Sequence, residues 1–230
     1  MKWYLLSIEE LNSGAEAEKL CERAMGYLDA HRLEKVRRLR AGNARNLSIG
    51  AGLLLQLAVG GDGGEALSCL TVTEALGRLD ERGRPIEIAY RYGAGGKPDF
   101  ADHALHFNLS HSGQYVCCAL DREEVGIDIQ QMRALKSREL VERRFSEGER
   151  TLLAGCANAA QREELFYRIW VRKESYAKLT GEGIAAVAAL DTGELKRRVC
   201  WQEYAFEGYC MAVCQYRLSA CQYCPPEGEE

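Results

Sequence analysis

The sequence lacks the long apolar runs of a membrane protein: no stretch approaches the roughly 18 residues that a spanning helix needs. Its first residues hold only about five apolar side chains before acidic ones, too few for the apolar core of a signal peptide. Residues 2–8 instead predict a first β-strand. Positive charge is not in excess either, since the formal net charge of −4 repels a nucleic-acid backbone at long range. We therefore expect a cytoplasmic protein that binds neither membranes nor nucleic acid.

Two common nucleotide-binding signatures are also missing. Neither the phosphate loop G-x-x-x-x-G-K-[ST] nor the turn G-x-G-x-x-G occurs, which argues against an unrelated Mg²⁺-dependent nucleotide enzyme. The chain has ordinary globular composition, with 230 residues of which 47% are hydrophobic and 28% charged. That is enough material for one substantial domain or two small ones.

Ten cysteines are present, but they are scattered among strand-like and helix-like runs, so we expect reduced thiols. A zinc site is the alternative at Cys210, Cys214, Cys221 and Cys224, whose last pair forms C-x-x-C. It is disfavoured because the first pair lies in a strand-like run, where alternate side chains face opposite ways.

Residues 164–181 predict an amphipathic helix that Gly181 ends. Glu174 and Lys178 lie at i, i+4 and so share one face, while Lys173 lies about 100° to the side. A surface salt bridge is the structural alternative for this acid and base. Alternatively, Glu174 and Lys178 belong to a functional site that includes polar residues earlier in the chain.

Three further stretches carry polar residues in unusual places. Residues 106–112 alternate as a strand, and Ser110 and His111 follow one another near its end; they do not suggest a Ser-His hydrolase, because neighbours on a strand point apart. Residues 114–120 and 125–129 predict a β-hairpin. Its second strand places Asp128 and Gln130 on one face, about 6.6 Å apart. An acid there is exposed, paired or bound to metal.

The remaining candidate functional residues lie in predicted helices, at a helix start or in a turn. Residues 31–40 form a basic helical stretch that is either a solvated face or an anchor for phosphate. Residues 47–59 predict an apolar helix. Ser48 near its start either caps this helix or contacts a ligand oxygen, and the cap is the favoured interpretation. A strand is expected around residues 86–90, and Lys97 lies in a turn. Residues 185–217 are expected to form strands with turns at 191–193 and 207–208. Ser146 and Glu149 form a capping-box pattern, which alone would account for that glutamate.

Taken in order, four stretches resemble the 4′-phosphopantetheinyl transferases, and among them the long type that activates surfactin synthetase. They are Gly96-Lys97-Pro98, Phe107-Asn-Leu-Ser-His-Ser112, Val125-Gly-Ile-Asp-Ile129 and Trp170-Val-Arg-Lys-Glu-Ser-Tyr-Ala-Lys-Leu-Thr-Gly181. The resemblance spans roughly residues 32–181.

The resemblance implies an α+β fold made of two pseudo-twofold-related α/β halves with a coenzyme A cleft between them. We place these halves at residues 1–112 and 113–220, the second with the metal site, followed by a tail at 221–230. The implied enzyme transfers 4′-phosphopantetheine from coenzyme A to a serine of an acyl or peptidyl carrier protein, depends on Mg²⁺ and releases adenosine 3′,5′-bisphosphate.

The family's functional positions map onto ten residues of this sequence. Asp128, Glu174 and Gln130 match metal-binding positions, and Lys178 matches the lysine beside the pyrophosphate. Coenzyme A contacts are implied for Arg32, Lys35, Lys97, Ser110, His111 and Lys178, and catalysis for Glu174, Lys178 and Glu149.

Gln130 departs from the family's usual second acid, so it supplies an amide oxygen but no charge. This departure keeps an alternative open, a catalytically degenerate module that binds coenzyme A or a carrier protein. The pathway, whether fatty acid or secondary metabolite biosynthesis, stays open as well. A monomer is expected.

Overall fold

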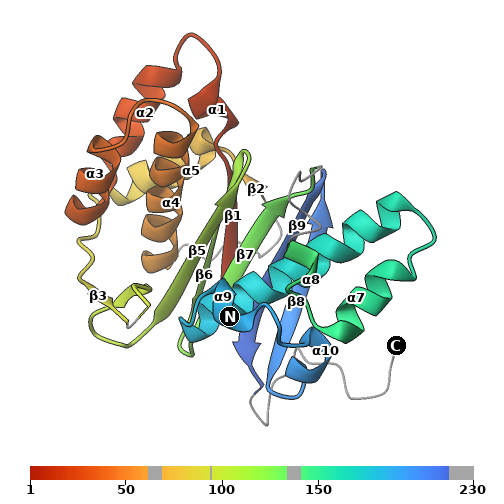
Figure 1. Cartoon of the computed structure of the whole chain (residues 1–230). Coiled ribbons are helices and arrows are strands. Elements are labelled where there is room, and N and C mark those ends of the chain that lie inside the picture. Colours follow the sequence, from red (N-terminus) through yellow and green to blue (C-terminus); the bar gives the residue numbers. More distant parts are fainter. Residues whose placement is uncertain (62–68, 94, 134–140, 218–230) are drawn as a thin grey trace. The chain divides into compact units, whose positions relative to one another are not determined.

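The structure is a computed structural model, which describes residues 1–61, 69–93, 95–133 and 141–217 (Figure 1). It divides into two compact units, Met1–Arg91 with Pro98–Arg122 and Tyr92–Lys97 with Glu123–Glu230. The halves expected at 1–112 and 113–220 stay a prediction, and the expected tail lies outside the described residues. No helix in the described part of the chain is long and apolar enough to span a membrane.

The first unit is built on a four-stranded sheet in the order β2-β1-β6-β5. The strands are β1 (Lys2–Ser7), β2 (Cys69–Leu70), β5 (His106–Ser112) and β6 (Tyr115–Asp121). Strand β2 is parallel to β1, and the other pairs are antiparallel. Two residues join β5 to β6, and the first, Gly113, has a φ of 59° that glycine tolerates best.

The long helix α4 (Asn43–Val59) packs against this sheet. The two approach closely at Gly50, where an added Cβ would lie 2.7 Å from Ile8 and 3.0 Å from Leu6. The other helices and short strands of the unit are α1 (Glu9–Asn12), α2 (Ala17–Met25), α3 (Ala30–Arg37), α5 (Val72–Arg82), β3 (Tyr90–Tyr92) and β4 (Pro98–Phe100). Residues 86–89 form no strand, although one was expected around residues 86–90. The Gln56 side chain bonds both backbone groups of Ile86: it accepts from the N–H at 2.8 Å and donates to the carbonyl at 2.7 Å.

The second unit is built on a three-stranded antiparallel sheet in the order β7-β9-β8. Its strands are β7 (Val125–Gln131), β8 (Val199–Phe206) and β9 (Tyr209–Tyr216). Helix α8 (Ala159–Thr180) lies across one face of this sheet (Figure 1). The remaining helices are α7 (Glu147–Ala154), α9 (Ile184–Val187) and α10 (Thr192–Leu195).

Two expectations about strands are wrong. Strands β6 and β7 form no hairpin, because β6 already pairs with β1 and β5, and β7 pairs with β9 instead. Residues 184–187 and 192–195 are helical where strands were expected, and Asp191 caps the second of these helices by accepting from the backbone N–H of Gly193 and Glu194.

The two units share part of their chain order. Each has a first strand, later a long helix and, at its end, two antiparallel strands of which the last pairs with the first strand (β1-β6-β5 and β7-β9-β8). The first unit has β2, β3 and β4 in addition. Helices and mainly antiparallel strands combine in both, so the α+β class is confirmed.

Candidate functional site

Asp128 is the centre of a polar cluster between β7 and α8. Its carboxylate is almost fully buried, and Lys178 Nζ lies 2.6 Å from Oδ1. The side-chain amide of Gln130 donates to Oδ2 at 3.0 Å. Of the alternatives for Asp128, an exposed strand face is therefore wrong, since the acid is buried and paired. Lys178 pairs with this strand acid and not with Glu174 one turn earlier on α8.

Glu174 faces the same cluster from α8. Partial burial raises the pKa of its carboxyl to about 7, and the charge of Asp128 adds to this while Lys178 opposes it. Two carboxylates that repel each other at one site are what a divalent cation stabilises, and carboxylate and amide oxygens suit Mg²⁺. In the described part of the chain no group of three or more His, Cys, Asp and Glu side chains is arranged to hold a metal. The side chains of this cluster that could supply oxygen ligands are the acids Asp128 and Glu174 and the amide Gln130.

Gly126 explains how β7 and α8 approach closely enough to form this cluster. An added Cβ would lie 2.0 Å from the Ser175 carbonyl oxygen and 2.6 Å from the Leu179 nitrogen. The space that glycine leaves on this face of β7 is therefore filled by the backbone of α8. Any larger residue would push the helix that carries Glu174 and Lys178 away from Asp128.

Lys97 lies at the C-terminal end of α8. Its ammonium donates to the Leu179 carbonyl at 3.0 Å and to the Val125 carbonyl at 3.4 Å. Carbonyls in the last turn of a helix have no partner within the helix, so a cation is favourable there. Lys97 thus joins α8 to the start of β7. Lys178 directly precedes Leu179, whose carbonyl Lys97 binds.

Glu149 and Lys173 form a buried pair in the second unit, with 2.7 Å between Nζ and Oε2. The predicted capping box is confirmed, because Glu149 accepts from the Ser146 backbone N–H as the cap requires. Its other oxygen accepts from the backbone N–H and the hydroxyl of Thr192. Lys173 also donates to the Leu190 carbonyl. Sequence reasoning missed this pair, since a lysine in a helix normally reads as solvent-facing.

In the first unit, Arg32 has the features of an anion-binding residue. It is 8% exposed, and its Nε is buried with no hydrogen-bond partner in the described structure. Asp29 caps α3 by accepting from the Arg32 backbone N–H at 3.0 Å, which fixes the start of the helix. The pKa of Lys35, one turn on, is lowered by loss of hydration and by the charge of Arg32. A bound anion would relieve both the unmet donor and the repulsion.

Ser48 faces the same region from α4. The expectation that it caps this helix is wrong, because α4 begins at Asn43 with Gly42 as its N-cap. The Ser48 hydroxyl is buried and has no partner in the described structure. Gly52, one turn on, is in contact with the stem of Arg32, whose Cγ would lie 2.9 Å from an added Cβ. Two buried donors without partners therefore line the α3–α4 contact.

Ser110 and His111 lie on β5 in the first unit, opposite Cys117 and Val116 of β6. Ser110 is buried and His111 is exposed. This agrees with the argument that the two point to opposite faces of the strand. The described cysteines are all free thiols, and Cys221 and Cys224 of the zinc alternative lie outside the described residues.

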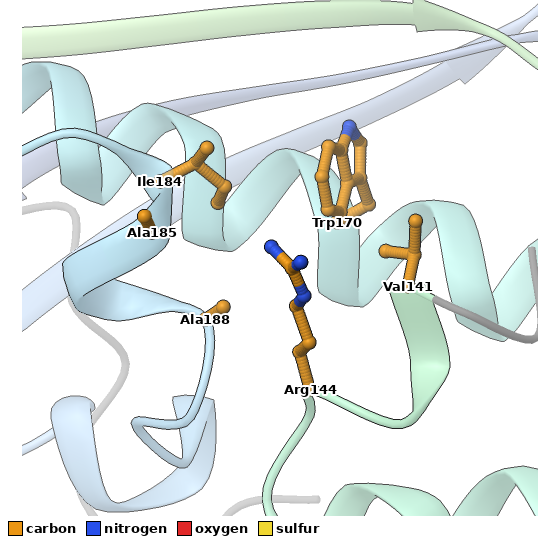
Figure 2. A pocket seen from close by; sticks show the side chains of 6 residues that line it. All are labelled: Val141, Arg144, Trp170, Ile184, Ala185 and Ala188. Atoms are coloured by element: carbon orange, nitrogen blue, oxygen red, sulfur yellow. The ribbon is translucent and has the colours of Figure 1, made fainter.

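An apolar cavity of about 240 Å³ opens beside α8 in the second unit. Trp170 and Val141 form one wall and Ile184, Ala185 and Ala188 another, and Arg144 directs its guanidinium between Trp170 and Ile184 (Figure 2). Trp170 lies one helical turn before Glu174, on the same face of α8. The cavity is therefore placed next to the acidic cluster along the helix.

The comparisons with known proteins point to one family. Residues 124–214 match the family model of the 4′-phosphopantetheinyl transferase superfamily. The chain is 38% identical to 4′-phosphopantetheinyl transferase Sfp of Bacillus subtilis (strain 168) over 94 residues, 41% of this chain and 40% of the relative. It is 33% identical to 4′-phosphopantetheinyl transferase HetI of Nostoc sp. over 112 residues, 46% of this chain and 47% of the relative.

A longer match is 33% identity over 156 residues with 4′-phosphopantetheinyl transferase psf-1 of Bacillus pumilus, covering 60% of this chain and 66% of the relative. The chain belongs to the 4′-phosphopantetheinyl transferase superfamily. The matches with Sfp and HetI span less than half of those relatives' length, 40% and 47%.

Proposed function

We propose that this chain transfers the 4′-phosphopantetheine group from coenzyme A to a serine of an acyl or peptidyl carrier protein and releases adenosine 3′,5′-bisphosphate. One observation carries the proposal: β7 and α8 bring Asp128, Glu174 and Lys178 together at the positions where the family motifs fall. The assignment to the long, surfactin-synthetase-activating type, the pseudo-twofold relation of the halves and a coenzyme A cleft belong to this proposal.

Asp128 and Glu174 would hold Mg²⁺, with Gln130 offering its amide oxygen as a third donor. A bound Mg²⁺ would offset the negative charge of the pyrophosphate and of the transition state. Lys178 would move from its partner Asp128 toward the same charge, since its side chain is 28% exposed and can reach a ligand. Its role is to stabilise charge on the leaving phosphate.

Coenzyme A itself would be held by cationic and hydroxyl groups. Arg32 and Lys35 would bind its 3′-phosphate, because the buried Nε of Arg32 lacks a partner and a phosphate oxygen would supply one. We add Ser48 to the residues that would bind the 3′-phosphate, because its buried hydroxyl also lacks a partner in the described structure. Ser110, His111 and Lys97 would make further phosphate contacts.

The carrier serine attacks the β-phosphate of coenzyme A, and its proton passes to Glu174, to Glu149 or to a water that one of them holds. Glu174 is half-buried and faces Asp128 and Lys178, where the pyrophosphate and the carrier serine would meet. Glu149 already accepts from Ser146 and Thr192 and pairs with Lys173. Of the two, Glu174 is the better candidate.

The reaction is tested by chromatographic detection of adenosine 3′,5′-bisphosphate after incubation with coenzyme A, Mg²⁺ and an apo carrier protein. Glu174→Gln should abolish product, while Glu182→Gln, an exposed glutamate just after α8, should leave it unchanged. Substantial turnover by Glu174→Gln would contradict the assignment. Tight coenzyme A binding that is independent of Mg²⁺, with no product from any carrier, would favour the degenerate binding module.

A further inference from the structure

The outer strand β8 holds α8 through one carboxylate. Oε1 of Glu203 accepts from Arg172, with Nε at 2.6 Å and Nη2 at 2.5 Å. Oε2 accepts from Nε of Arg168 at 3.1 Å. The Glu203 and Arg172 side chains are 20% and 18% exposed, so salt screens this pair less than a pair on the open surface. Glu203 therefore binds two consecutive turns of α8.

Trp201, two residues earlier on the same face of β8, holds the backbone of the same turn. Its indole N–H lies 3.2 Å from the Arg172 carbonyl oxygen and 3.2 Å from Ser175 Oγ. The Ser175 hydroxyl also donates to the Arg172 carbonyl, at 3.0 Å. Glu203 thus holds the side chain of Arg172, and Trp201 holds its backbone. The contacts lie on both sides of Glu174 in the sequence.

Glu203 and Asp128 lie in one row across the sheet, on its two outer strands. Both pair with Ala212 of β9, Asp128 from β7 and Glu203 from β8, so two strand spacings, about 10 Å, separate them. Asp128 holds α8 through Lys178. Glu203 holds it through Arg172. The helix is therefore tied to both outer strands of the sheet that it crosses (Figure 1).

Arg172 and Glu174 project from nearly opposite sides of α8, because two residues turn an α-helix by about 200°. Arg172 reaches β8, and Glu174 faces the cluster at β7. A roll of the helix about its axis would move both side chains together. At a helix radius of about 5–6 Å, a roll of about 20° moves a side-chain tip by about 2 Å. A metal–ligand distance tolerates only about 0.2 Å.

We propose that Glu203 is a positioning residue for the transfer reaction, which fixes the roll of α8 through Arg172. Glu174 then keeps its place beside Asp128 when Lys178 turns toward the pyrophosphate. The inference rests on the proposed function, in which Lys178 leaves Asp128. At that step the ion pair at β7 is broken, and the ion pair at β8 remains. Glu203 acts through the helix and not as a ligand of the substrate or the metal.

Steady-state kinetics test this role, with the full-length chain, Mg²⁺ and an apo carrier protein that the wild type modifies. Glu203→Met removes both acceptor oxygens and should lower kcat about tenfold, while the KM for coenzyme A stays within about twofold. Arg172→Met should have the same effect. Glu194→Met makes the matching change at an exposed glutamate of the same unit, and should alter neither constant by more than about twofold.

Charge reversal tests whether the ion pair itself is needed. Arg172→Glu places two carboxylates together, and Glu203→Arg places three guanidinium groups together, so each change alone should lower kcat. The double variant restores an opposite-charge pair between β8 and α8 and should recover most of the wild-type kcat.

A readout that does not need turnover is the rise in Tm that Mg²⁺ causes in the presence of coenzyme A. A ligand that binds the folded state raises Tm in proportion to its affinity for that state. The rise should be smaller in Glu203→Met than in the wild type, because the two acids are no longer aligned, and unchanged in Glu194→Met.

A wild-type kcat and a wild-type response to Mg²⁺ in Glu203→Met would overturn the positioning role. A lower stability in urea with an unchanged kcat would overturn it as well, because Glu203 would then only stabilise the unit. A rise in the KM for coenzyme A in place of a fall in kcat would also contradict it. Failure of the wild type to modify any carrier would contradict the proposed function, and the response of Tm to Mg²⁺ would still test Glu203.

Discussion

Lys173 and Glu149 pair at 2.7 Å, with side chains that are 0% and 3% exposed. The pair joins three elements: α8 through Lys173, the start of α7 through the Ser146 cap, and the start of α10 through Thr192. Lys173 directly precedes Glu174, so whatever fixes Lys173 also fixes the rotation of α8 that turns Glu174 toward Asp128. Removing one partner leaves a buried charge, which burial strongly disfavours.

The first prediction follows from the cost of leaving one buried charge without its partner. Lys173→Met should lower the free energy of unfolding by about 3–5 kcal/mol, because the Glu149 carboxylate then lies buried without its counter-charge. Glu149→Gln should cost a comparable amount. The double variant should recover much of the loss, since it buries no net charge. Urea unfolding of the four proteins gives this comparison.

Activity of the same four proteins separates two roles for Glu149. If Glu149 only positions α8, the double variant should be more active than either single variant. If Glu149 accepts the proton of the carrier serine, the double variant should be no more active than Glu149→Gln. Equal kcat values for these two would therefore contradict a positioning role.

Gly126→Ala should separate β7 from α8. A Cβ there would lie 2.0 Å from the Ser175 carbonyl oxygen, a backbone atom that cannot rotate away. We expect a loss of about 1–3 kcal/mol in the free energy of unfolding, together with a fall in kcat. Gly77→Ala on α5 is the matched control, because an added Cβ there meets no atom within 4 Å. It should stabilise by about 0.5–1 kcal/mol, and a similar effect at both positions would count against the close contact.

The pKa of Glu174 gives a prediction about pH. In the folded, metal-free protein it is raised to about 7, whereas in the unfolded chain a glutamate titrates near about 4.3. Between these values the folded state holds a proton that the unfolded state has lost, so this contribution to stability is present at low pH and is lost as the pH rises toward 7. The Tm of the wild type should therefore fall relative to that of Glu174→Gln between about pH 4.5 and 7.5 without metal. Parallel Tm profiles would show that the carboxyl is not perturbed.

Arg32 should recognise one particular phosphate. Arg32→Met keeps much of the buried stem but removes the donors, and should raise the Kd for coenzyme A about tenfold by loss of a charge-assisted hydrogen bond. For 3′-dephospho-coenzyme A, the wild type and the variant should bind alike in calorimetry. Arg40→Met, at an exposed arginine just after α3, serves as the control. A tenfold loss for both ligands would place Arg32 away from the 3′-phosphate.

Local patterns in the sequence were sufficient for much of this fold. Apolar spacing and a terminal glycine predicted the helix over 164–181, which begins at Ala159 and ends at Thr180 with Gly181 in the left-handed conformation. The alternation over 106–112 and the capping box at Ser146 are likewise confirmed. Each depends on residues a few positions apart, and such periodicities are readable in one sequence.

Features that depend on distant partners could not be read in the same way. The hairpin expected between β6 and β7 is wrong because strand pairing is decided across the chain, where β9 competes for β7. Lys173 was read as a cation on the side of a helix, and only its approach to Glu149 shows why it is buried. Ser48 resembled a cap because the start of α4 lies in a polar stretch without apolar spacing.

The central claim is that this chain modifies a carrier protein at a serine, and the intact mass of apo carrier proteins tests it most directly. Each carrier is incubated with the purified chain, coenzyme A and Mg²⁺, alongside a carrier whose attachment serine is changed to alanine. We predict a gain of one phosphopantetheinyl group on at least one carrier, and none on its alanine variant. Unchanged masses on every carrier, from a protein that still binds coenzyme A, would contradict the transferase.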